Sequence, residues 1–231
     1  MLRSPTLAVL CLVAAPFFAL VAAPESNAPS TEKVEKKPAP APEAVGDKST
    51  TGKAVTEKGE DKKQTPLEKK LSLTRRLRKV NRFPEAFAKL EEAQALANDD
   101  DARLEVDFTR GQLYFSQAQA IVEKRLEGDD PAAIMANGIK VFERIAREHK
   151  DTTEGAGSAY LIGSSYFVLD ELAKAMAAYN KSYSEFPKSH LRAKSLMRIG
   201  VCQAGLGNAT QAARTFRHLS KEFPDKTKDV K

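Results

Sequence analysis

The residue types best suited to catalysis or metal binding are sparse and scattered in this chain. The three histidines, His149, His190 and His218, have no spacing that would place two of them on one helix face, so the sequence does not indicate a metal site. Cys202 has no identifiable base or orienting group, which favours a buried structural role. Phosphate-binding loops and hydrolase nucleophile motifs are missing as well. The sequence therefore predicts that the protein is not an enzyme and binds no metal and no cofactor.

Positive charge gathers in one stretch, in which Glu68 is the only acid among Lys69, Lys70, Arg75, Arg76, Arg78, Lys79 and Arg82. Helical spacing places four of these cations on one face: Arg75, Arg78, Lys79 and Arg82. Such a basic face could bind an acidic protein, anionic lipid headgroups or nucleic acid. The alternative is a solvated face, because the terminal helices of a repeat array need a polar outer surface. The export signal described below argues against nucleic acid, and the formal net charge of +6 is modest.

The C-terminal part of the chain contains one pattern twice, at an offset of 37 residues. Gly163 recurs as Gly200, Ala175 as Ala212, Tyr179 as Phe216, and Phe186-Pro187 as Phe223-Pro224. Similarity at a fixed period of this length predicts stacked supersecondary units. The small residues suit places where two helices approach closely, and proline ends each unit because it cannot continue a helix. The sequence therefore predicts a stack of helical hairpins.

This pattern resembles the tetratricopeptide repeat. The family's glycine, tyrosine, aromatic residue and closing proline fall on Gly163, Tyr166, Tyr179 and Pro187. The second copy has Gln203 in place of the tyrosine, both copies lack the opening tryptophan, and residues 188–191 lengthen the family's 34-residue period to 37. The lengthened form is similar to the repeats of two kinds of bacterial envelope protein. These are the periplasmic TolA-binding, cell-division coordinator family and the lipoprotein of the outer-membrane β-barrel assembly machine.

Residues 66–231 are predicted to form one all-α domain of about eight helices without strands, with hairpins at about 67–97, 102–150, 157–187 and 192–224. Thr65 and Pro66 have the types expected of an N-cap and a first helical residue. The first helix has an apolar stripe that we expect to be buried, formed by Leu67, Leu71, Leu73, Leu77 and Val80.

The second hairpin is irregular. Gly111 lies 52 residues before Gly163, so 15 residues exceed one period, while Phe142 aligns with Tyr179. We expect the extra residues to extend the first helix of this hairpin through Leu126. The segment Gly128-Asp129-Asp130-Pro131 then stops that helix and starts the next one.

The N-terminal residues divide into two segments outside this domain. Residues 1–23 have the features of an export signal, with Arg3 before an uncharged apolar stretch that ends in small residues. Pro24 disfavours cleavage after Ala23, so an uncleaved signal that contacts the membrane is the alternative to a removed one. A lipidated Cys11 is disfavoured, because Leu10 stands where a small residue is needed. Residues 24–65 are rich in Pro, Lys, Glu, Ser and Thr without aromatic residues, which predicts a disordered linker.

The resemblance implies that a partner binds along the first helices, at positions three before, one after and four after each repeat glycine. These positions are Tyr160, Ser164 and Phe167 in one repeat, Met197, Val201 and Ala204 in the next, and Phe108, Gln112 and Phe115 in the irregular hairpin, with Lys194 at the edge. Such a groove suits an extended segment or an amphipathic helix. The alternative is that several of these residues belong to the core or are covered by the N-terminal hairpin.

These features together predict an exported, non-enzymatic protein-interaction module of a bacterial cell envelope, built as a tetratricopeptide-like domain on a flexible tether. The resemblance implies a coordinator that links envelope constriction to cell-wall synthesis. That family carries an N-terminal coiled coil, whereas residues 24–65 are proline-rich and lack heptads. The alternative is a membrane-anchored structural or assembly component of an envelope complex.

Overall fold

The computed structural model of the chain describes residues 64–226. The predicted signal at 1–23 and all but the last two residues of the predicted linker at 24–65 lie outside this part of the chain. Eight α-helices and a short 3₁₀ helix at Pro224–Lys226 form the described part, which contains no strand. This confirms the predicted all-α fold of eight helices. Their bounds are α1 (Pro66–Lys79), α2 (Phe83–Gln94), α3 (Asp100–Val122), α4 (Pro131–Glu148), α5 (Thr153–Val168), α6 (Leu172–Glu185), α7 (Arg192–Gly205) and α8 (Ala209–Glu222).

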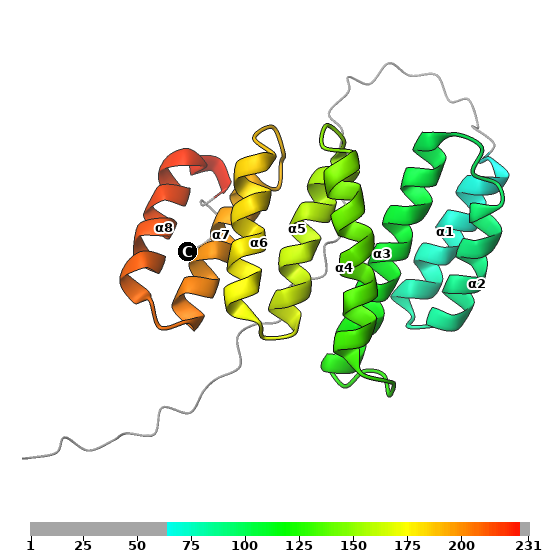
Figure 1. The fold of residues 1–231 in the computed structure, drawn as a ribbon, viewed down its shortest axis with the longest axis horizontal. Helices are drawn as coiled ribbons and strands as arrows, with labels where there is room; N and C mark the ends of the chain where they lie inside the picture. The colour runs from blue at the N-terminus through cyan, green and yellow to red at the C-terminus, as the bar shows by residue number, and fades with distance from the viewer. Residues whose placement is uncertain (1–63, 227–231) are drawn as a thin grey trace, which may run out of the picture. The chain divides into compact units, whose positions relative to one another are not determined.

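The helices stack in chain order. Each helix packs against the next one, with the cyan α1–α2 hairpin at one end of the row and the orange and red α7–α8 hairpin at the other (Figure 1). In addition, α3 contacts both α1 and α5, so the first helices of the first three hairpins lie beside each other. Such nearest-neighbour packing is the architecture of a repeat solenoid. It covers an interior hairpin on both sides and a terminal hairpin on one side only.

A glycine on the first helix and an aromatic ring on the second helix fix three of the hairpins in the same way. A Cβ atom placed on Gly163 would lie 2.6 Å from the Tyr179 ring, and one on Gly200 would lie 2.6 Å from the Phe216 ring. In the irregular hairpin, a Cβ atom on Gly111 would lie 2.5 Å from the Phe142 ring. At each position a larger residue would collide with the ring unless the ring moved. The structure thus confirms the predicted alignment of Phe142 with Tyr179.

The extra residues of the irregular hairpin lengthen α3, as expected, but the helix ends before Leu126. It stops at Val122, and Lys124 adopts a left-handed φ of 56°. The backbone N–H groups of Arg125 and Leu126 then donate to the carbonyl oxygen of Ala120, which is how a left-handed residue closes a helix C-terminus. Leu126 folds back onto the core of the first hairpin instead of continuing the helix. Asp130 accepts from the N–H of Ala132 and caps the start of α4.

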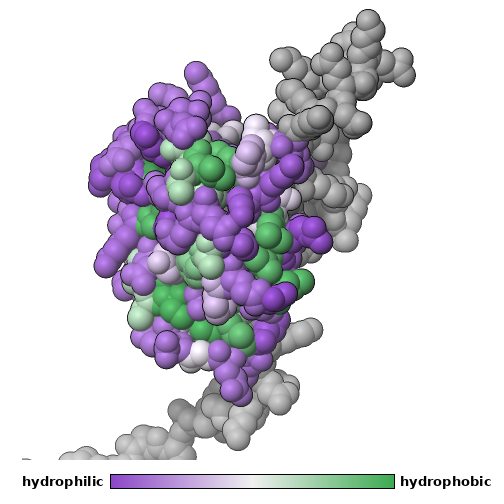
Figure 2. All heavy atoms as spheres, turned by 90° about the vertical axis from the view of Figure 1, so that its right-hand side faces the viewer, coloured by the Kyte–Doolittle hydropathy of each residue, from purple (hydrophilic) through white to green (hydrophobic). Residues whose placement is uncertain are grey.

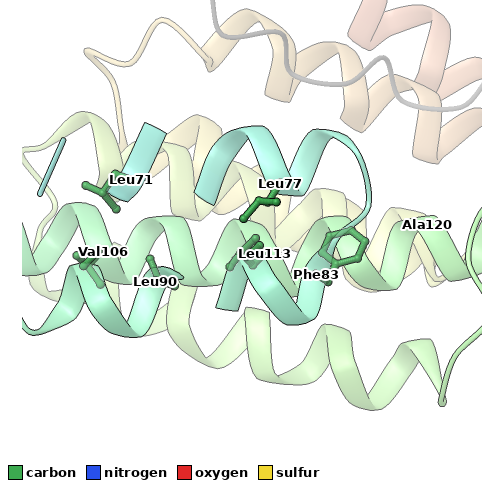
Figure 3. Close-up of a cluster of buried hydrophobic side chains, with 9 residues drawn as sticks. Leu71, Leu77, Phe83, Leu90, Val106, Leu113 and Ala120 are labelled. Carbon is green, nitrogen blue, oxygen red and sulfur yellow. The ribbon is translucent and has the colours of Figure 1, made fainter. Parts of the chain in front are cut away.

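The core of the first hairpin is shared with α3, and Figure 3 shows its side chains. Only part of the apolar stripe predicted for α1 is buried: Leu71 and Leu77 are enclosed, whereas Leu73 and Val80 are 37% and 64% exposed. The prediction was wrong for these two residues because the buried face of α1 follows a three-residue spacing, on which Thr74 stands between the two leucines. The Thr74 hydroxyl donates to the Lys70 carbonyl at 2.9 Å, so the hydroxyl is buried without losing a hydrogen bond. The cluster comprises Leu71, Leu77, Phe83, Ala86, Leu90, Ala93, Val106, Leu113 and Ala120.

Candidate partner-binding surfaces

Two of the residues predicted to face a partner are buried. Tyr160 is 5% exposed and its ring centroid lies 5.4 Å from that of Tyr179. Ser164 is 6% exposed, and its Oγ accepts a hydrogen bond from the Tyr179 hydroxyl at 3.1 Å. Burial raises the pKa of Tyr179 above its usual range, so this hydroxyl stays protonated and keeps donating. Tyr160 and Ser164 therefore support the packing of α5 and α6 and do not offer surface to a partner.

The remaining apolar members of the predicted set are half-exposed. They lie on three successive first helices: Phe108 and Phe115 on α3, Phe167 on α5, and Met197 and Val201 on α7. We call these five residues the first-helix surface. Lys194 on α7 is exposed, as is Ala204. The Phe108 ring lies edge-on to the buried Phe142 ring, with centroids 6.1 Å apart, and Phe115 packs against the core between α3 and α4. The structure therefore leaves part of each of these side chains exposed on successive first helices.

Arg198 adds a polar group to the first-helix surface, which the sequence did not indicate. Its guanidinium carbon lies 5.2 Å above the centroid of the Phe167 ring, so the side chain bridges α7 and α5. Its Nε is buried and has no hydrogen-bond partner among residues 64–226. An unsatisfied buried donor costs roughly 1–3 kcal/mol.

The predicted basic face on α1 is largely engaged in contacts within the chain. Arg75 forms an ion pair with Glu105 at 2.6 Å, and Arg82 forms one with Glu85. Arg78 donates to the side-chain oxygen of Gln112, a residue predicted to face a partner. Lys79 is exposed. The N-terminal hairpin thus covers Gln112, and Figure 2 shows the end formed by α1 and α2 as a mostly hydrophilic surface with separate hydrophobic patches.

A second basic region, which sequence reasoning missed, covers the last hairpin. No Asp or Glu lies between Glu185 and Glu222, and this absence was readable from the sequence. Within α7 and α8, Glu222 pairs with Arg192 at 2.9 Å. The other five cations of the two helices have no acidic partner in the described part of the chain. They are Lys194, Arg198, Arg214, Arg217 and Lys221. The hairpin therefore presents positive charge that the fold does not neutralise.

A groove of about 420 Å³ lies between α4 and α6, with α5 as its floor. Ile162 and Tyr166 line the floor, and the rim carries charges of both signs, including Glu143, Lys150 and Lys181. Its existence depends on how far apart two second helices lie, which the sequence pattern does not encode. With mixed charges on the rim, the groove has no preference for a partner of one sign.

The residues suited to chemistry are far apart. Cys202 is fully buried on α7, and burial raises the pKa of its thiol to about 11. His149 caps the end of α4, His190 lies in the turn before α7, and His218 lies beside Glu222 at 3.3 Å on α8. Within residues 64–226, no three His, Cys, Asp or Glu side chains come close enough to hold a metal ion. None of the helices described is both long and apolar enough to cross a membrane.

Comparison with known proteins identifies the two regular hairpins. The tetratricopeptide repeat model matches residues 158–189 and 194–226. No curated protein matches the chain in sequence. One solved structure contains TPR-like repeats from Podosopora anserina and is described as a kinesin light chain. Its alignment covers 71% of this chain and 97% of the other chain, with 16% sequence identity and a TM-score of 0.37. A variant of that protein covers 67% of this chain and 93% of its own at 17% identity, with a TM-score of 0.35. The hairpins α5–α6 and α7–α8 thus match the tetratricopeptide repeat, a class of repeat that generally serves as a protein-interaction module.

Proposed function

We propose that this protein is a non-enzymatic adaptor of a bacterial cell envelope and that its helical array holds a segment of a protein partner. The observation that carries the proposal is the first-helix surface, where half-exposed apolar side chains lie on three successive helices of a repeat fold. Solenoids bind their partners through continuous surfaces of this kind. Apolar pockets with a few polar contacts suit an extended segment or an amphipathic helix.

The geometry around Phe167 supports an extended segment in particular. Arg198 lies over the Phe167 ring and is part-exposed. Its terminal guanidinium N–H groups donate to a backbone carbonyl of the bound segment while an apolar side chain of the segment packs beside the ring. The hydrogen bond gives orientation, and the apolar contact gives affinity that salt does not screen.

The envelope location rests on the sequence. An apolar segment at 1–23 that follows Arg3 has the features of an export signal, and the proline-rich residues 24–65 suit a tether. The lengthened repeat, similar to that of the TolA-binding coordinator family, agrees with this location. Pro24 favours a second candidate function, a membrane-anchored assembly component, because an uncleaved signal would hold the domain at the membrane.

Fractionation of the source cells, with the mass of the purified chain, tests the location. A periplasmic pool whose mass shows removal of residues 1–23 agrees with a free adaptor. Full-length chain in the membrane pellet selects the anchored component. Recovery of full-length chain from the cytoplasm contradicts both forms of the envelope proposal.

Photo-crosslinking in cells tests the binding surface. A benzoylphenylalanine at position 167 replaces Phe167 with a larger aromatic side chain that reacts with whatever touches it. The matched control places the same group at Asn180, which is exposed on α6. We expect a discrete protein adduct from position 167 and none from position 180. Equal labelling from both positions, or none from position 167, would show that this surface holds no partner.

A further inference from the structure

The last hairpin exposes an aromatic side chain that is buried in the two hairpins before it. Phe142, Tyr179 and Phe216 occupy the same place, each ring lying against the glycine of its own hairpin. Phe142 and Tyr179 are 0% and 1% exposed, whereas Phe216 is 37% exposed. The difference arises because α5 packs against α4 and α7 packs against α6. Among residues 64–226, only the short 3₁₀ helix at Pro224–Lys226 follows α8.

The exposed ring is part of a wider apolar face. Ala209 and Ala213 are exposed, and they lie seven and three residues before Phe216, on the same side of α8. Met197 and Val201 on α7 are half-exposed, whereas Tyr160 and Ser164, their counterparts one period earlier, are buried. We call these five residues the open-end face: Met197, Val201, Ala209, Ala213 and Phe216.

The preceding repeat shows what fits such a face. There, α7 packs against α6, and its Ala193, Leu196 and Ile199 join Tyr179 in one buried cluster. Those three residues recur every three positions, so they form a single stripe along α7. The open-end face repeats the surface that this stripe fills, with smaller side chains around the ring. Its shape therefore suits one amphipathic helix lying along α7 and α8.

Charge decides which helix fits. The last hairpin carries five cations without an acidic partner in residues 64–226. Arg198 lies over Phe167 of the preceding repeat, whereas Arg214 and Arg217 directly follow Ala213 and Phe216 of the open-end face. A second copy of this chain that docked through its own last hairpin would bring like charges into contact, which opposes association. An acidic helix would instead neutralise the cations beside the face.

We propose that the open-end face docks an amphipathic helix of a partner protein, with acidic residues flanking an apolar stripe, in the way that α7 packs against α6. This interaction goes beyond the proposed function, because it uses a different binding mode from the segment held at Phe167 and does not depend on the envelope location. It gives the scaffold a second site, one that takes a helix.

The probe is a stapled helical peptide with the 14-residue sequence of α7, in which Arg192, Lys194 and Arg198 are each replaced by Glu. A staple is needed because an isolated helix of this length is marginal in water. The control peptide has the unchanged, basic sequence with the same staple. Fluorescence anisotropy with the full chain should show binding of the acidic peptide at least about tenfold tighter than the control, and weaker binding as salt rises. Equal affinities, or no binding at about 1 mM peptide, overturn the proposal.

Two variants of the full chain test the location of the site. Ala213→Glu adds an acid to the exposed open-end face, and Gln211→Glu adds the same charge to an exposed position on another side of α8. We expect Ala213→Glu to lower the affinity for the acidic peptide at least about tenfold. Gln211→Glu should change that affinity less than about threefold. Phe216→Ala, which removes the ring without adding charge, should also weaken binding. Equal effects of the two Glu variants overturn the proposal, because the response would then be one of net charge.

Further controls separate this site from the first-helix surface and from self-association. Ala213→Glu should leave the adduct formed from position 167 unchanged, and Phe167→Ala should leave peptide binding unchanged, so that either proposal can fail alone. Sedimentation equilibrium should give the same mass for the unsubstituted chain and for Ala213→Glu. A dimer that Ala213→Glu dissociates would overturn the proposal in favour of a second copy of the chain as the occupant.

Discussion

Replacing the repeat glycine by alanine should lower the free energy of unfolding in one hairpin and leave it nearly unchanged in another of nearly the same geometry. On Gly163, the new Cβ would lie 2.6 Å from Cδ1 and 2.7 Å from Cε1 of Tyr179. On Gly200, it would lie 2.6 Å from Cε1 of Phe216. Both separations are too short, so the ring has to move in each case. The rings differ in their freedom to move.

The Tyr179 ring has no free space to move into. It is 1% exposed, its hydroxyl donates to Ser164, and its ring packs against Tyr160. Overpacking a core costs about 1–3 kcal/mol, and displacing the ring also weakens a hydrogen bond worth about 1 kcal/mol. Alanine stabilises the helix by about 1 kcal/mol relative to glycine through its helix propensity. The net expectation for Gly163→Ala is a loss of about 2 kcal/mol in the free energy of unfolding.

Phe216 can move toward solvent, because it is 37% exposed and has no hydroxyl. The overpacking term is then small, and the propensity gain of about 1 kcal/mol offsets it. Gly200→Ala should therefore leave the free energy of unfolding within about 1 kcal/mol of its original value.

Urea unfolding of the full chain, followed by far-ultraviolet circular dichroism, measures both effects. Gly163→Ala should lower the midpoint clearly, and Gly200→Ala should leave it nearly unchanged. Equal shifts in the two variants would show that enclosure of the ring does not control the energetic cost of the added Cβ atom. A stabilised Gly163→Ala would refute the close approach itself.

Other side chains yield further predictions. Because burial raises the pKa of the Cys202 thiol to about 11, the folded chain keeps the thiol neutral and should react slowly with iodoacetamide at about pH 8, but quickly in urea. For the same reason, the stabilising effect of burial is fully present below the unfolded pKa of about 9 and is lost as the pH rises toward about 11, so Cys202→Ala should flatten this alkaline fall in melting temperature. Thr65→Ala removes the side chain that accepts from the Glu68 N–H, and should cost about 1 kcal/mol in urea unfolding. Phe83→Ala, at 0% exposure, should cost about 3–5 kcal/mol, whereas Val80→Ala, at 64% exposure, should cost less than about 0.5 kcal/mol; similar costs would contradict the core assignment.

The hairpins were predictable because their determinants are local. The spacing of Gly163, Ala175, Tyr179 and Pro187 repeats in the next unit, and the contact between the glycine and the aromatic ring lies within one hairpin. The same logic extended to Gly111 and Phe142 across an irregular turn. Helix starts followed from single residues, as with the capping box at Thr65.

The exposure of a side chain was harder to predict because it depends on which helices of the neighbouring repeat pack against it. Tyr160 and Met197 hold the same repeat position, yet one is buried by the neighbouring repeat and the other is half-exposed at the end of the described helices. The contact between Arg78 and Gln112 joins helices that are not consecutive in the chain. Neither fact is encoded in a repeat pattern. By contrast, the lack of acids between Glu185 and Glu222 was visible in the sequence and went unused.

The proposed function requires that the first-helix surface holds a protein partner through apolar contacts. A pull-down from envelope extract, washed at low and at high salt, compares the full chain as bait with a folded Phe167→Ala variant. We expect one partner that the unsubstituted chain retains at high salt and that Phe167→Ala loses. Retention of that partner by Phe167→Ala, or its release by salt alone, would show that apolar contacts on this surface do not hold it.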